Sequence, residues 1–436
     1  MKQIAGIFIL VLITCSVKAQ TVDTLRLSTV VQRVVSTYPS VEQAREALKS
    51  AEEKVVQSRS AWRPVVSGTA SYLWMDPVST MKFDGHVVDL GMRNNYNMGI
   101  DVSQVLYDFG KNRPKVEVAR LQEELTRIQN EELYQSLALQ AIQSYYLTGF
   151  ARKAIGIKQE ELDNYTRLLE EMGVKKETGS ATEFDVLNTR VKHSTTETEL
   201  RTLQANKNIQ QVNLSLLVDT LVDDRVPLAR VELPVLPPEM LAGLVRAGLE
   251  NRPEMIAARK QLEVARQMER VNVRMYNPIL EASASMGAKN GFQPHLDRLK
   301  MNYTVGATLS IPIYDGGNRR SEKVLSHSQF AQTEAAVRLV AKRVEKEITG
   351  YYNNMVASNS KIRLLILQVQ VAIEAYRQAE VNYRAGAITN LELLTSSTNV
   401  TNAKLQLEQE KINYVITYYQ LMMAIGKNLR STLPPR

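Results

Sequence analysis

The chain has 436 residues and a formal net charge of +8, with 44% hydrophobic and 23% charged residues. Its single cysteine, Cys15, argues against a disulfide framework, a cysteine-based zinc site and a thiol nucleophile. The histidines are scattered without HExxH spacing, and no GxxxxGK[ST], GxGxxG or GxSxG motif occurs. We therefore expect no catalytic residue, no metal site and no cofactor. The modest basic excess lacks a basic-aromatic patch, so nucleic-acid binding is not expected either.

The first twenty residues have the pattern of an export signal. Lys2 precedes an apolar stretch from Ile4 to Ile13, and Ala19 completes an acceptable cleavage site before Gln20. We expect residues 1–19 to be removed, with lipidation of Cys15 as the alternative. No later stretch contains eighteen consecutive apolar residues, so no transmembrane helix is predicted.

The remainder of the chain is an internal duplication. Residues 38–64 match 252–278 at an offset of 214, and from Gly99 onward the offset is 207, which places a longer loop between residues 75 and 95 of the first copy. The predicted divisions are a signal peptide (1–19), a first copy (20–221), a proline-rich linker (222–240), a second copy (241–426) and a C-terminal tail (427–436), of which residues 431–436 are expected to be loose.

Each copy begins with a helical segment that ends at a proline, followed by two runs of alternating polarity. Period-two alternation predicts strands, so each copy contributes one hairpin. One face of each strand is apolar, as with Tyr96, Met98 and Ile100, while the other is polar. The polar face includes Asp101, Ser103, Glu281 and Thr308.

A long helix follows each hairpin, starting near Arg113 and near Arg320. Apolar residues at spacings of three and four predict coiled-coil-like packing of these helices. A glycine corner and a last helix complete each copy. The fold class is therefore mainly helical, with four strands in the whole chain.

Four strands cannot close a barrel, and an open sheet edge in lipid leaves backbone groups unpaired. The sheet is then either a soluble sheet packed on helices or one part of a barrel shared by several chains. In a shared barrel the polar faces would line water. A turn at the end of each hairpin joins strand to helix, and glycine supplies its unusual backbone angles. The corner residues are Tyr107, Asp108, Gly110, Tyr314, Asp315, Gly316 and Gly317.

The corners "LYDFG" and "PIYDGG", the tandem repeat, and the stretches "GSATEFDVLNTR" (179–190) and "YRAGAITNLELLTSS" (383–397) occur in one order. In this combination the chain resembles the TolC-type outer membrane efflux protein family over essentially all of its mature length. The resemblance implies a homotrimer whose twelve-stranded barrel lies in outer membrane lipid, above a long antiparallel helical coiled-coil barrel in the periplasm.

The resemblance also implies a transport function and no catalytic activity. Such proteins are exit ducts that join a periplasmic adaptor (membrane fusion) protein and an inner-membrane transporter of the RND or ABC type. Efflux of small molecules is the expected role. A type I protein-secretion channel is the alternative, and an exported coiled-coil scaffold is the rival from a different class.

Particular residues match family positions at the periplasmic end. The resemblance assigns adaptor docking to the two tips, Gly179, Ser180, Ala181 and Thr182, and Gly386, Ala387, Ile388 and Thr389. It assigns the periplasmic gate to Asp185, Tyr383 and Glu392, with a hydrogen bond between Tyr383 and Asp185. This chain departs from the family at two positions. Thr395 stands where some members have a second aspartate, and Ile388 stands where the family has an arginine.

Overall fold

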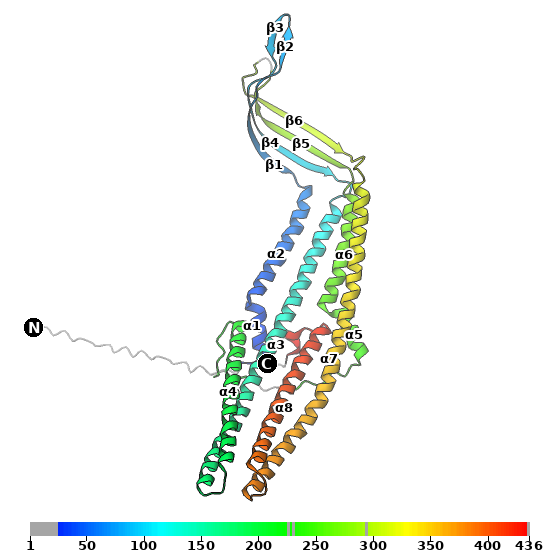
Figure 1. The fold of residues 1–436 in the computed structure, drawn as a ribbon. Coiled ribbons are helices and arrows are strands. Elements are labelled where there is room, and N and C mark those ends of the chain that lie inside the picture. Colours follow the sequence, from blue (N-terminus) through cyan, green and yellow to red (C-terminus); the bar gives the residue numbers. More distant parts are fainter. Residues whose placement is uncertain (1–24, 225–226, 229–231, 293–294, 434–436) are drawn as a thin grey trace, which may run out of the picture.

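The computed structural model describes residues 25–224, 227–228, 232–292 and 295–433 of the chain. The expected signal peptide and Cys15 therefore lie outside the described residues. Long helices run from a sheet at one end to two helix turns at the other (Figure 1). None of the helices in these ranges is both long and apolar enough to cross a membrane.

Two helical hairpins make up most of the structure. In the first copy α3 (Arg113–Glu177) turns into α4 (Glu183–Val218), and in the second copy α7 (Asn318–Arg384) turns into α8 (Asn390–Ala424). The 65 residues of α3 extend roughly 100 Å at 1.5 Å per residue. The long helices are thus confirmed, and the second begins two residues before the expected Arg320.

The helical segment before each sheet hairpin is two helices rather than one. These are α1 (Leu27–Thr37) and α2 (Pro39–Arg59) in the first copy, and α5 (Leu241–Asn251) and α6 (Pro253–Arg274) in the second. Pro39 and Pro253 each occupy the first position of the second helix, where the missing N–H costs nothing. A short 3₁₀ helix, η1 (Ser60–Trp62), follows α2.

The main sheet is antiparallel in the order β1 (Val65–Trp74), β4 (Asn94–Tyr107), β5 (Ile279–Lys289) and β6 (Lys300–Ser310). Its register aligns polar residues in rows across one face and apolar residues across the other. One polar row is Ser67, Asp101, Ser285 and Thr304, and the neighbouring apolar row is Val66, Val102, Ala284 and Val305. The predicted alternation is therefore confirmed, and hydroxyls join the polar row, with Ser285 Oγ 2.7 Å from Thr304 Oγ1.

The expectation of four strands was wrong for the first copy. The longer loop between β1 and β4 holds a separate two-stranded ribbon, β2 (Thr80–Phe83) and β3 (His86–Asp89), which projects beyond the main sheet (Figure 1). Asp84 and Gly85 both have positive φ angles, 47° and 81°, as a two-residue hairpin turn requires. An Asp-Gly pair is a recognisable sequence signal for this turn.

The two copies meet in the sheet at a pair of glycines. Gly99 of β4 lies directly opposite Gly287 of β5. A Cβ atom built on Gly287 would lie 2.8 Å from the Cα of Gly99, and one on Gly99 would lie 3.1 Å from the carbonyl oxygen of Met286. At this position the two backbones are therefore too close for side chains.

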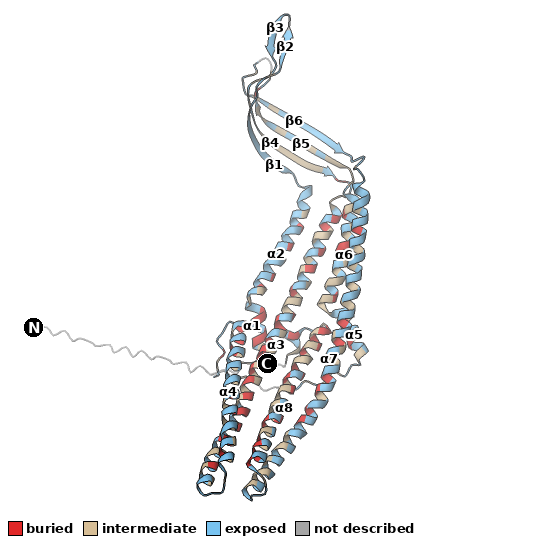
Figure 2. Cartoon of the chain, viewed as in Figure 1, coloured by how far each residue is buried: buried red, intermediate tan, exposed pale blue. Residues whose placement is uncertain are grey.

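The hydrophobic core lies at mid-height, where α1 and α5 pack against the long helices and buried residues gather (Figure 2). Leu214 and Leu421, equivalent positions in the two copies, are both fully buried there. Residues 431–436 were expected to be loose, but Ser431 and Thr432 belong to a short helix and their hydroxyls donate to the Asn428 carbonyl at 2.8 and 2.7 Å. Leu429, in α9 (Leu429–Thr432), is fully buried, and its N–H donates to Gln135 Oε1 at 2.9 Å. Residues 434–436 lie outside the described residues.

We predict that Gly426→Ala destabilises the protein by about 2–5 kcal/mol. Gly426 ends α8 with φ of 79°, and a Cβ there would lie 2.5 Å from the carbonyl carbon of Asn251. Thermal unfolding followed by circular dichroism would measure the effect. Gly350→Ala in α7 is the matched control, because nothing lies within 4 Å of its Cβ position and helix propensity predicts a gain of about 0.5–1 kcal/mol. Equal behaviour of the two variants would contradict the prediction.

Candidate functional site

The first strand-to-helix corner is held by a buried aspartate. Asp108 accepts hydrogen bonds from the backbone N–H groups of Gly110 at 3.0 Å and Asn112 at 2.9 Å, and from the Trp62 indole at 3.2 Å. These N–H groups precede α3 and would otherwise lack partners at the start of a helix. The carboxylate therefore fixes the direction in which the helix leaves the sheet.

The second corner repeats this construction. Asp315 accepts from the backbone N–H groups of Gly317 at 3.1 Å and Arg319 at 2.6 Å. Gly316 and Gly317 have φ angles of 68° and 88°, so both need the left-handed conformation that glycine permits. In the first copy Phe109 adopts this conformation at the position of Gly316, with φ of 50°. The need for glycine at these corners was predicted from the sequence, whereas the role of the aspartates was not.

The two tips at the other end also share one design. Gly179 and Gly386 end α3 and α7 with φ angles of 74° and 73°. The next N–H in each tip donates to a carbonyl five residues earlier, from Ser180 to Lys175 and from Ala387 to Asn382, both at 2.8 Å. This is the Schellman arrangement, which satisfies the last carbonyls of a helix.

The two acids expected in the gate begin the returning helices. Asp185 accepts from the backbone N–H of Thr182 at 3.1 Å, and Glu392 accepts from that of Thr389 at 2.7 Å. Each threonine hydroxyl in turn accepts from the backbone N–H of its acid, which completes a capping box. The bonds from the Thr389 N–H and hydroxyl lower the pKa of Glu392. Thr-x-x-Asp and Thr-x-x-Glu are recognisable in the sequence, so this structural role could have been predicted.

The resemblance implied a hydrogen bond between Tyr383 and Asp185, but the structure does not contain it. Its hydroxyl donates to Met172 Sδ at 3.0 Å, and Lys175 Nζ lies 4.4 Å from the ring centroid. Burial is the main cause that raises the pKa of Tyr383, with Lys175 opposing it. The expected hydrogen bond is thus absent from the structure, where the Tyr383 hydroxyl is directed to Met172 and the Asp185 Oδ2 atom accepts from Thr182. Tyr383 instead connects the two long helices, α7 and α3.

Asn390 joins the two tips and was missed in the sequence. Its side-chain amide donates to the Asp185 carbonyl at 3.1 Å and to the Thr189 hydroxyl at 2.8 Å, from the first turn of α8 to α4. Asn390 is buried, and its Oδ1 atom has no hydrogen-bond partner in the structure. No motif distinguishes this asparagine in the sequence, because its partners lie about 200 residues away.

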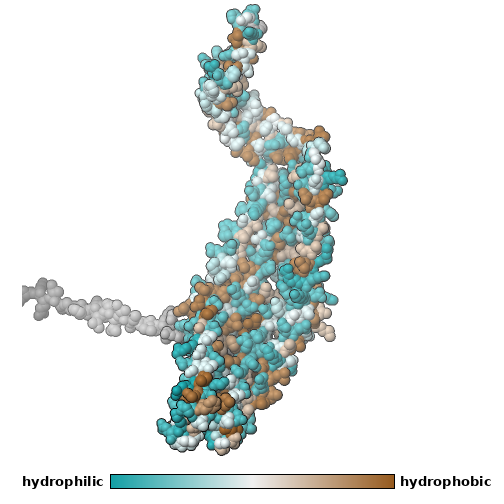
Figure 3. All heavy atoms as spheres, viewed as in Figure 1, coloured by the Kyte–Doolittle hydropathy of each residue, from teal (hydrophilic) through white to brown (hydrophobic). Residues whose placement is uncertain are grey.

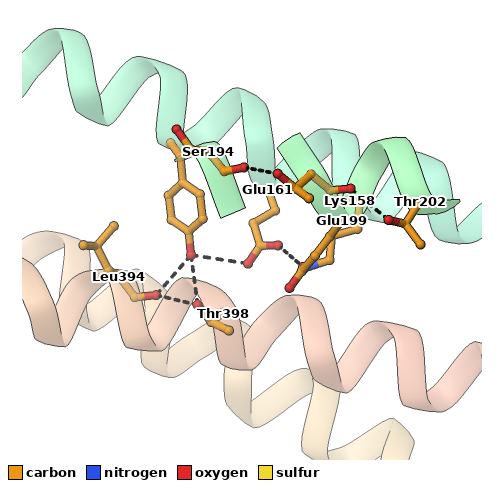
Figure 4. A network of polar contacts seen from close by, with 9 residues as sticks. Lys158, Glu161, Ser194, Glu199, Thr202, Leu394 and Thr398 are labelled. Carbon is orange, nitrogen blue, oxygen red and sulfur yellow. Dashed lines mark hydrogen bonds and ion pairs between the residues drawn. The ribbon is translucent and has the colours of Figure 1, made fainter. Parts of the chain in front are cut away.

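A polar network centred on the buried residues Lys158, Glu161 and Tyr165 lies above the tips, between α3, α4 and α8 (Figure 4). Lys158 contacts Glu161 at 2.7 Å and Glu199 at 2.6 Å. Burial opposes the charge on Lys158, but its hydrogen bonds to both acids outweigh that effect and raise its pKa. The Tyr165 hydroxyl lies 2.9 Å from Thr398 Oγ1 and donates to the Leu394 carbonyl at 3.3 Å, which links α3 to α8. Burial raises the pKa of Tyr165 to about 12.

The remaining tip residues form a small surface. Ser180, Thr182, Ala387 and Thr389 are exposed, and Ala181 and Ile388 are partly exposed. Two large apolar side chains at equivalent positions are also exposed there and were not singled out in the sequence. They are Phe184, 67% exposed, and Leu391, 52% exposed. No cluster of three or more potential metal ligands occurs within the described ranges.

Comparison with known proteins places this architecture in a family. The model of the outer membrane efflux protein family matches residues 30–219 and 244–427, so the chain belongs to that family and is located in the outer membrane. The two matched segments correspond to the two copies of the repeat. The hairpins, corners and tips are therefore parts of an outer membrane efflux protein.

The chain is similar to outer membrane protein TolC of Escherichia coli strain K12, with 22% identity over 92% of this chain and 82% of that protein. It is also similar to outer membrane efflux protein BepC of Brucella suis biovar 1, with 21% identity over 88% and 81% of the two chains. The crystal structure of the Campylobacter jejuni CmeC outer membrane channel has the same fold. Its TM-score is 0.78 at 17% identity, over 92% of this chain and 85% of that one.

We predict that the first turn of α8 loosens as pH falls because Glu392 becomes protonated. Its folded-state pKa is lowered, so its stabilising contribution is complete above the ordinary value of 4.5 and is lost as pH falls through the folded value. Hydrogen-exchange protection of the turn, corrected for intrinsic rates, should decrease at low pH in the wild type. Glu392→Gln should remove this dependence, because glutamine keeps the capping geometry without the charge. Thr389→Ala should weaken protection at every pH. If the pH dependence were unchanged in Glu392→Gln, protonation of Glu392 would not be its cause.

Proposed function

We propose that three copies of this chain form one exit duct through the outer membrane. The observation that carries the proposal is the open four-stranded sheet, in which β1 and β6 are both edges. In hydrocarbon each unpaired backbone N–H or C=O group costs several kcal/mol. Pairing of β6 with β1 of the next copy satisfies these groups, and three copies give a closed barrel of twelve strands with its polar face toward water.

The helices support the same assembly. Large apolar side chains are exposed along α7, where a single chain leaves them in water: Leu339, Leu364, Leu367, Val371 and Val381. Hydrophobic residues gather on the visible surface of the lower helical part (Figure 3). A neighbouring copy that covers these residues would extend the barrel downward as a tube of packed helices, because burial of apolar surface is the main driving force for association.

We propose that the tips contact a periplasmic adaptor, which connects the duct to an inner-membrane transporter of the RND or ABC type. The tips are the part of the chain farthest from the sheet (Figure 1). Phe184 and Leu391 expose apolar surface there, and each lies in the first turn of a helix fixed by a capping box. Exposed apolar side chains on rigid, repeated turns are suited to a protein partner.

The proposed cargo is small molecules, and the descriptions of the matching family and of BepC as efflux proteins support this choice. The gate is proposed to lie at the tip end, where Asp185, Tyr383 and Glu392 occur. Tyr383 connects α7 to α3 through Met172, so displacement of one hairpin relative to the other requires this contact to break. Opening of the duct is proposed to separate the two hairpins at this level.

The assembly proposal predicts a trimer in detergent that forms ion-conducting channels in a planar bilayer. Light scattering corrected for bound detergent should give the mass of three chains. Chemical cross-linking should give species of one, two and three chains, with none larger. A dominant monomer would contradict the shared barrel, and a trimer without conductance would contradict the duct.

The docking proposal predicts that Ala181→Arg and Ala387→Arg each abolish efflux, because a bulky charge at a tip would obstruct the adaptor. The amount of trimer in the membrane should remain normal, since neither side chain lies in the core. Ala47→Arg is the matched control, because Ala47 is an exposed alanine on α2, far from the tips. Accumulation of a fluorescent efflux substrate in whole cells would measure transport. Full efflux in both tip variants would exclude the tips as the adaptor contact.

A further inference from the structure

Basic side chains surround the junction between the sheet and the helices. They come from the ends of α2 and α6 and from the starts of α3 and α7, and we call them the basic collar. The basic collar comprises Arg59, Arg63, Lys111, Arg113, Lys115, Arg270, Arg274, Arg319, Arg320 and Lys323. The segments that hold these residues, 59–63, 108–115, 270–274 and 315–323, contain three acids: Asp108 and Asp315, which already bind backbone N–H groups at the corners, and Glu322. Glu117 and Glu269 lie just outside them.

The collar lacks counter-charges in the structure. Among the described residues, none of its ten members forms a salt bridge, although basic residues elsewhere on the same helices do, such as Arg127 with Glu123 and Arg338 with Glu334. The collar arginines instead contact uncharged groups. Arg274 donates to the Gly110 carbonyl at 3.4 Å, and the Arg319 guanidinium lies 5.9 Å from the Tyr276 ring centroid.

Part of the collar surrounds a hollow between α3 and α6. Its volume is about 400 Å³, and its lining includes Arg113, Arg270 and Arg274 together with one acid, Glu117. Glu117 faces Arg120 at 4.0 Å, outside the collar. Three guanidinium groups around one hollow can offer several N–H donors to a phosphate, and arginine binds phosphate oxygens in a bidentate manner.

The opposite end of the sheet has no such excess. The two connections there, residues 75–93 and 289–300, hold five basic residues, Lys82, Arg93, Lys289, Arg298 and Lys300. They also hold four acids, Asp76, Asp84, Asp89 and Asp297. Arg93 pairs with Asp76 at 3.1 Å. The positive charge is thus concentrated at the helical end of the sheet.

Next to the collar the strands end in exposed apolar residues. Leu309 is 53% exposed, and Ile313, between β6 and the collar, is 94% exposed. A change from apolar to basic surface within a few residues is the profile of a boundary between hydrocarbon and headgroups. We propose that the basic collar binds the phosphate groups of anionic phospholipids in the leaflet that faces the helices. The inference rests on the proposed membrane position of the sheet.

The proposal predicts selective retention of anionic lipid by the full-length protein. Each basic residue near an anionic surface raises the binding constant for anionic lipid by about fivefold, so two substitutions lower that constant by roughly 30-fold at most. Purified trimer would be equilibrated with mixed micelles of phosphatidylglycerol and phosphatidylcholine, and the retained lipids counted by mass spectrometry. We expect phosphatidylglycerol to be enriched on the wild type and this enrichment to fall severalfold in Arg319→Gln/Arg320→Gln.

Matched variants distinguish an effect of the basic collar from an effect of the protein's net charge. Lys342→Gln/Lys346→Gln changes the charge equally on exposed positions of the same helix, away from the collar, and should keep the enrichment. Arg319→Lys/Arg320→Lys should also keep most of it, because the positive charge remains. Inorganic phosphate at millimolar concentration should not displace the lipid, since a lipid is held by its chains as well as its headgroup.

Equal enrichment in the wild type and the collar variant would overturn the proposal. If that variant also had changed ion selectivity in pure phosphatidylcholine, the arginines would lie in the water-filled interior instead. Trimer mass and bilayer conductance of the wild type are measured in the same preparation. A conducting trimer without lipid preference therefore refutes the collar alone, whereas a monomer refutes the proposed duct.

Discussion

The hydrogen-bonding requirement of the backbone at β1 and β6 determines how the rest of the structure must be understood. A four-stranded sheet with two open edges satisfies its N–H and C=O groups in water but not in lipid. In the proposed assembly, the single chain is therefore one segment of a larger wall. The same proposed assembly accounts for the exposed apolar residues on α7, because a neighbouring copy would cover them.

Because the chain is duplicated, the same local hydrogen-bonding arrangements occur in both copies. Asp108 and Asp315 each bind the N–H groups at the start of a long helix, and Thr182 and Thr389 each begin a returning helix. These arrangements use neighbours in sequence, so they do not depend on the rest of the fold. The copies differ where local constraint is weak, as in the loop between β1 and β4 that carries an additional ribbon.

Periodic features could be predicted from the sequence, whereas contacts between distant segments could not. Strand polarity and helix length follow from repeating patterns, and the register of the sheet agrees with the alternation. The Asp84-Gly85 turn and the capping boxes had local signals that were not used. By contrast, the Asn390 and Tyr165 contacts join helices about 200 residues apart. Nothing in their own neighbourhoods marks these two residues, so only the packed helices reveal them.

The glycine pair at the seam between the two copies has a geometric consequence for an assembled wall. With Gly99 facing Gly287, the two backbones approach more closely than side chains would allow, so the sheet can bend sharply along this line. Each chain has one such pair, between β4 and β5, the two middle strands of its sheet. Three sheets joined edge to edge would therefore enclose a cross-section with three corners, closer to a rounded triangle than to a circle.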